Sequence, residues 1–128
     1  DKFGNIKTAT TENNAGGGIG SQKATLNGTT NVTIISAPAS SHKRKVLCIR
    51  AVNIDTAVVT LNLYKNISAT VTLVDTLVGL AVSGVWKPVN TIEPMVLDNA
   101  NETLEMDMGG AAATVNPVVY TEFEDIVP

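Results

Sequence analysis

The sequence predicts an all-β fold: a single antiparallel β-sandwich or jelly roll of about seven or eight strands with an extended N-terminal arm. Three observations lead to this prediction. Short runs rich in Val, Ile, Leu and Thr recur beyond residue 30, and turn residues separate them roughly every 8–12 positions. No window of about ten or more residues shows helical spacing of its apolar residues. Several short strands without helices are typical of a sandwich.

The chain divides at about residue 30 into an arm, residues 1–30, and a sandwich domain, residues 31–128. The arm holds only four large apolar side chains: Phe3, Ile6, Ile19 and Leu26. Ordering thirty residues costs on the order of 30–60 kcal/mol of backbone entropy. Four apolar side chains at about 1.5–3 kcal/mol each cannot offset that cost. We therefore expect the arm to lack regular structure and to be ordered by contact with other chains.

Strands in the sandwich domain are expected where apolar runs lie between turn residues. They are Val32–Ser36, Lys45–Asn53, Val58–Lys65, Val71–Val74, Pro94–Leu97, Thr103–Met108 and Thr114–Glu124, with a weaker one near Ala81–Trp86. The run from Val46 to Val52 is apolar on nearly both faces apart from Arg50, which indicates a central strand.

Alternation of apolar and polar residues predicts which side chains face the core. Leu61 and Leu63 share one face of their strand, and Thr60 and Asn62 share the other. The expected core residues are Val46, Cys48, Leu61, Leu63, Val96, Leu104 and Met106.

Composition predicts a protein that works by contact with other protein subunits. Charged residues make up 16% of the chain, against roughly 25% in an average soluble domain, so part of the surface is expected to be covered. With the two-sided apolar strand, this favours a homo-oligomer, most simply a trimer. The net charge of −3 argues against nucleic acid as a partner. No stretch approaches the roughly 18 apolar residues of a membrane span, so no membrane partner is expected.

The residue types that carry catalysis or bind metals are scarce. His42 is the single histidine and lies among cations without an adjacent aspartate, so a catalytic triad is not expected. Cys48, the single cysteine, lies in an apolar run that predicts a buried, inert thiol. The segment Asp98–Glu102 is interpreted as a hairpin turn, with a calcium loop as the alternative; it lacks the glycine and spaced carboxylate of an EF-hand. We expect no enzymatic activity, no cofactor and no metal.

Lys43, Arg44 and Lys45 form the concentrated basic patch of the sequence. Its simplest interpretation is the solvated start of a strand. The alternative is a contact with carboxylates of a neighbouring subunit. Nucleic acid is the least favoured partner, because no aromatic residue stands nearby to stack on a base.

Two stretches carry a resemblance to a known group of proteins. The first is Val46–Asp55, with Ile49-Arg50 and then Asn53 and Asp55 at its turn, followed by Val58–Tyr64. The second is Pro94–Glu105, followed by a Gly/Ala turn and a last strand. The pattern covers roughly residues 44–124 and is similar to that of small β-sandwich virion proteins of tailed bacteriophages, including capsid decoration (cement) proteins and head–tail accessory proteins. The basic patch and the loop from Trp86 to Pro94 have no place in the pattern.

The resemblance implies a structural virion protein without a catalytic motif. The first interpretation is a capsid decoration protein that binds and stabilises the major capsid shell, in a virion assembled in the host cytoplasm. Its partners would be the major capsid protein or other virion subunits. The alternatives are a neck, tail or fibre-base protein, a pilus-like subunit completed by a donated strand, or a carbohydrate-binding module that exposes Trp86 or Tyr64. The side chains expected to contact partners are Phe3, Ile6, Ile19, Lys43, Arg44 and Lys45.

Overall fold

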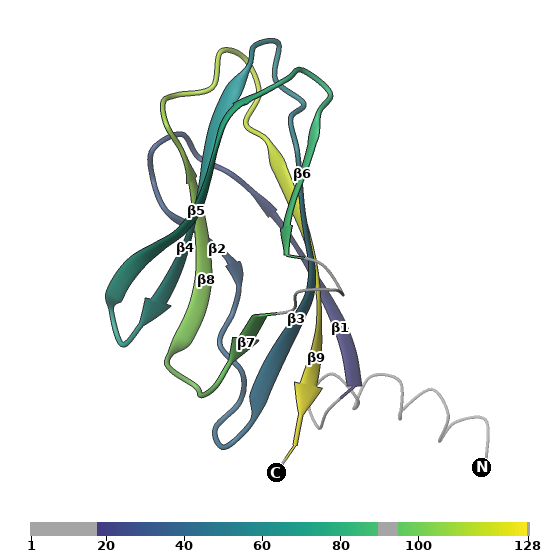
Figure 1. Cartoon of the computed structure of the whole chain (residues 1–128), viewed down its shortest axis with the longest axis vertical. Helices are drawn as coiled ribbons and strands as arrows, with labels where there is room; N and C mark the ends of the chain where they lie inside the picture. Colours follow the sequence, from purple (N-terminus) through teal and green to yellow (C-terminus); the bar gives the residue numbers. More distant parts are fainter. Residues whose placement is uncertain (1–17, 90–94, 128) are drawn as a thin grey trace, which may run out of the picture.

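The computed structural model describes residues 18–89 and 95–127, which form two antiparallel sheets packed as layers of a β-sandwich (Figure 1). This confirms the all-β fold. The strands of the described residues are β1 (Gly18–Thr25), β2 (Val32–Ile35), β3 (Lys43–Val52), β4 (Val59–Ile67), β5 (Thr70–Leu80), β6 (Val85–Val89), β7 (Met95–Leu97), β8 (Glu102–Met108) and β9 (Val118–Ile126).

One sheet has the order β1-β9-β3-β6, with β7 also paired to β3, and the other has the order β2-β8-β4-β5. Strand β3 is central, as its apolar sequence predicted, because β9 pairs with one of its edges and β6 and β7 share the other. The edge strands of the second sheet are β2 and β5. All these pairs are antiparallel.

The N-terminal region contains a strand that the sequence did not predict. Strand β1 lies inside the predicted arm and pairs with β9 over its whole length, from Gly18 opposite Asp125 to Thr25 opposite Val118. For these residues the expectation of no regular structure is wrong. The entropy argument counted buried side chains and omitted the backbone hydrogen bonds of a sheet edge. Leu26 follows the strand into the core. Residues 1–17, with Phe3 and Ile6, lie outside the described residues.

The core confirms most of the side chains predicted by alternation. Val46, Leu61, Leu63, Leu104 and Met106 are all buried between the sheets. Val96 is only half-buried and its neighbour Leu97 is buried instead.

A β-bulge explains why Cys48, another predicted core residue, is half-buried. The register of β3 against β9 shifts between Val46 and Cys48, which leaves Leu47 as the extra residue. Beyond the bulge the inward side chains are Ile49 and Ala51, both fully buried. A bulge adds one residue to one strand and so reverses the alternation after it.

Loops meet at one end of the sandwich around the fully buried side chain of Asn53. Its Nδ2 atom donates to the carbonyl oxygens of Ala57, Leu80 and Ala81 at 2.9, 3.0 and 3.2 Å. Its Oδ1 atom accepts the backbone N–H of Asp55 at 2.9 Å. One amide therefore ties the β3–β4 loop to the end of β5.

The carboxylate of Asp55 ties the same loop to the one before β9. Oδ1 accepts the N–H groups of Thr56, Thr114 and Val115 at 2.8, 2.8 and 3.1 Å, and Oδ2 accepts that of Ala113 at 2.8 Å. These donors favour the ionised form. The Val115 N–H has the largest effect, and together they lower the pKa of Asp55 from 3.8 to about 2, although burial acts in the opposite direction.

The bulge predicts different effects of substitution at two apolar positions of β3, Leu47 and Ile49. Ile49→Ala is expected to lower the free energy of unfolding by about 2–5 kcal/mol, because it leaves a cavity in the core. Leu47→Ala removes a half-buried side chain at the bulge and should cost considerably less. Chemical denaturation of both variants measures the difference. An equal loss of unfolding free energy in the two variants would mean that the bulge lies elsewhere in β3.

Asp55→Asn is expected to destabilise the fold at neutral pH, because an amide group cannot accept on both sides of the carboxylate. The folded-state pKa of Asp55 is depressed, so its contribution is present above pH 3.8 and is lost as the pH falls towards about 2. The gap in melting temperature between wild type and variant should therefore narrow over that range. Thermal melts at a series of pH values test it, and a gap that does not change with pH would contradict the assignment.

Candidate functional site

A groove with a cavity volume of about 620 Å³ crosses the outer face of the five-stranded sheet over β1, β9, β3 and β6. A pocket of this size can hold a drug-sized ligand or a few residues of an extended chain. Its charged, aromatic and thiol-bearing lining residues are Lys23, Cys48, Arg50, Lys87, Tyr120 and Glu122.

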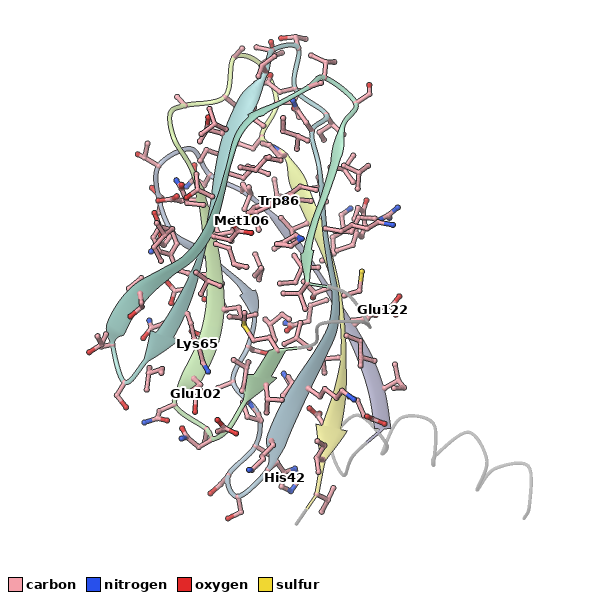
Figure 2. The ribbon with its side chains drawn as sticks, in the orientation of Figure 1. His42, Lys65, Trp86, Glu102, Met106 and Glu122 are labelled. Carbon is pink, nitrogen blue, oxygen red and sulfur yellow. The ribbon has the colours of Figure 1, made fainter. Side chains whose placement is uncertain are left out.

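The strand register arranges this lining in rows across the sheet. Lys23, Tyr120 and Arg50 are partners on β1, β9 and β3. Two residues along β9, Glu122 lies opposite Cys48 in the next row. Figure 2 shows Glu122 on the side of the sheet that faces away from the second sheet. Alternate residues of a strand share a face, which explains why these side chains gather there.

The groove is locally cationic. The Lys23 Nζ atom lies 5.9 Å, and the Arg50 Cζ atom 5.0 Å, from the centroid of the Tyr120 ring. Cations at such distances are attracted by the negative face of an aromatic ring. With Lys87, three cations face one carboxylate, Glu122, among the lining residues that the structure describes, in a chain whose net charge is −3. The groove is therefore suited to an anionic ligand.

The sequence prediction missed this groove. Its cations are far apart along the chain and form no local motif, and only the pairing of β1, β9 and β3 brings two of them onto Tyr120. Cys48, predicted to be a buried and inert thiol, lines the groove because the bulge turns it away from the core.

The three residues of the basic patch have different surroundings in the structure. Arg44 is buried, and its Nε and Nη2 atoms lie 2.6 and 3.0 Å from the carboxylate oxygens of Asp125 in the same chain. Its Nη1 atom donates to the Ser36 carbonyl at 2.9 Å, and its Cζ atom lies 4.0 Å from the centroid of the Phe123 ring. Arg44 is thus not available for the predicted contact with another subunit, because it is an inward-facing residue of β3.

The remaining predicted contact residues in the described region lie on the surface. The Lys43 Nζ atom is 3.6 Å from Asp98 Oδ1, and both side chains are exposed. Lys45 is half-buried opposite Glu124 in the register, and Ile19 is the exposed partner of Glu124 on β1. Their contacts with other subunits stay predictions.

The Asp98–Glu102 segment is a turn, but it connects β7 in one sheet to β8 in the other and is therefore not a hairpin. The Glu102 Oε1 atom lies 2.9 Å from Lys65 Nζ, which also donates to the Val96 carbonyl at 3.3 Å (Figure 2). Among residues 18–89 and 95–127, no group of three or more His, Cys, Asp or Glu side chains is placed to hold a metal ion.

The two aromatic residues proposed for a sugar site lie elsewhere. Trp86 is partly buried and packs against the core. The Tyr64 hydroxyl donates to Asp107 at 3.1 Å, and burial followed by this hydrogen bond raises the pKa of Tyr64. The aromatic residue in the groove is Tyr120. His42 lies at the turn that precedes β3 (Figure 2).

No protein-family profile and no curated protein matches this chain. Among solved structures, it is similar to one described as Bacillus endospore appendages that form a novel family of disulfide-linked pili, with 17% identity, a TM-score of 0.43, and coverage of 89% of this chain and 92% of that one. It is also similar to a chain of the cyanophage Pam1 capsid asymmetric unit, with 16% identity, a TM-score of 0.36 and coverage of 88% and 84%. A chain of infectious bursal disease virus, strain Gx, matches with 11% identity and a TM-score of 0.40, covering 85% of this chain but 33% of the viral one.

By these descriptions, the neighbours come from the pili of Bacillus endospores, from a cyanophage capsid and from infectious bursal disease virus. All three TM-scores lie below 0.5, so the likenesses carry no weight for the function of this chain. In the described residues, no helix is long and apolar enough to cross a membrane.

Arg44→Gln is expected to lower the free energy of unfolding by about 3–5 kcal/mol, because it leaves the buried Asp125 carboxylate without its partner. Lys43→Gln, which breaks only an exposed pair, should change it by no more than about 1 kcal/mol. Chemical denaturation of both variants measures the two values. A small effect of Arg44→Gln would mean that the guanidinium is solvated and free for other contacts.

Proposed function

We propose that this chain is a structural virion protein that acts by binding other protein subunits, with capsid decoration as its first role. In that role it binds and stabilises the major capsid shell, and like subunits associate as trimers. The observation that supports the proposal most directly is the edge strand β5.

Strand β5 is eleven residues long, and nine of these residues are exposed. Its exposed apolar side chains are Val71, Leu73, Val74 and Val78. The strand contains no proline, and Asp75 is its single charged residue. Soluble monomers usually protect an edge strand with charges, prolines or short length, since unpaired backbone groups beside apolar side chains recruit other strands. Two register shifts against β4 twist this edge but leave its side chains apolar.

An edge of this kind is suited to assembly. Another subunit that covers it removes apolar area from water and can pair with the free backbone groups of β5. Repetition over a symmetric particle then multiplies a modest contact by avidity. Phe3, Ile6, Ile19, Lys43 and Lys45 stay proposed as further contacts.

Leu73→Glu tests the assembly role. Leu73 is 54% exposed, so the charge should leave the fold intact and weaken subunit association by about tenfold or more, because the carboxylate loses its hydration in the contact. Sedimentation velocity of the free protein and its occupancy on purified particles measure this. Val85→Glu, a similarly exposed position on the other sheet, is the matched control. A monomer whose particle occupancy is unchanged by Leu73→Glu would overturn the proposal.

A further inference from the structure

We propose that the groove on the five-stranded sheet binds an extended, carboxylate-rich polypeptide segment of another protein. This inference goes beyond the assembly role of β5, because the groove lies on the other sheet and no residue of β5 lines it. Either proposal can therefore fail without the other.

The charges of the lining residues are the first argument for a ligand with several negative groups. Lys23, Arg50 and Lys87 are exposed and come from three different strands, and Glu122 is the single carboxylate among the described residues that line the groove. The whole chain is acidic, so this positive excess is local and acts on a ligand only when the ligand is docked close to it. A ligand with several negative groups spaced along an extended chain can reach more than one of the cations.

The position of Arg50 favours carboxylates. Its guanidinium lies over the Tyr120 ring, with the Cζ atom 5.0 Å from the ring centroid. A guanidinium held over an aromatic ring can still donate two parallel hydrogen bonds to a carboxylate through its N–H edge. Lys23 on β1 and Lys87 on β6 add point charges on either side of the Arg50 guanidinium.

The same arrangement disfavours sugars and nucleic acids. Tyr120 has cations next to it from both neighbouring strands, Lys23 on β1 and Arg50 on β3, so its ring is not a free platform for a sugar or a base. Glu122, in the next row, repels a closely spaced phosphate backbone but can accept hydrogen bonds from the amide groups of a polypeptide.

Binding of a hexaglutamate peptide, measured by calorimetry on the full chain, tests the proposal, with a hexaglutamine peptide as the uncharged control. We expect binding of hexaglutamate alone, weakened as salt is raised from about 0.05 to about 0.5 M. An oligogalacturonate and a single-stranded oligothymidylate of matched length report the competing ligand classes. Tighter binding of either than of hexaglutamate would overturn the proposal, as would no binding of hexaglutamate.

Two double variants with the same change in charge locate the site. Arg50→Gln with Lys87→Gln is expected to weaken hexaglutamate binding by about tenfold or more, because charge-assisted hydrogen bonds are lost. Lys43→Gln with Lys45→Gln removes two charges from the same sheet outside the groove, at positions proposed for other subunit contacts, and should weaken hexaglutamate binding much less. An equal loss of hexaglutamate affinity in the two variants would show that the peptide is attracted to the surface in general, and it would overturn the assignment of the groove as its site.

Cys48 supplies an independent readout, because it is the single cysteine of the chain and lines the groove. Bound hexaglutamate should slow the reaction of the thiol with a neutral thiol reagent several-fold, and hexaglutamine should not. A reaction rate unchanged at saturating hexaglutamate would place the peptide outside the groove.

Discussion

The loop anchor formed by Asn53 and Asp55 is the constraint on which the rest of this sandwich depends. Both side chains are buried, and between them they bind backbone groups of the loops after β3, β5 and β8. A buried polar group is costly unless it is hydrogen-bonded, so the anchor stabilises one loop arrangement and opposes others. In the described residues, every buried side-chain nitrogen and oxygen has a hydrogen-bond partner. The ends of both sheets are thereby held together at one pole.

Two ion pairs join neighbouring strands, one fully buried and one with a half-buried lysine. Arg44 with Asp125 joins β3 to β9 within one sheet, and Lys65 with Glu102 joins the end of β4 to the start of β8 in the other. Such pairs cost desolvation and are retained where their geometry is good. Strand β5 takes part in neither pair and carries one charged residue, Asp75, so its apolar edge lacks charged protection.

The outer faces of the two sheets differ in chemistry. The five-stranded sheet presents rows of cations, one aromatic ring and carboxylates, with a groove across them. The four-stranded sheet presents amides that satisfy its acids, as Asn62 does for Asp107 and Asn66 for Glu105, and ends in the apolar edge of β5. The groove and the edge strand β5, for which we propose different contacts, therefore lie on different sheets.

The sequence by itself determined the fold class, the central place of β3 and the alternating core of β4 and β8, because period-two patterning and turn residues are local properties. It did not reveal β1, whose stability comes from backbone pairing with a strand about a hundred residues away in the sequence. It also did not reveal the bulge at Leu47, which moved Cys48 to the surface, or the partner that buried Arg44. The groove was likewise decided only by the tertiary structure. Its cations become neighbours through the order and register of the strands, and no single segment of the sequence determines either of these.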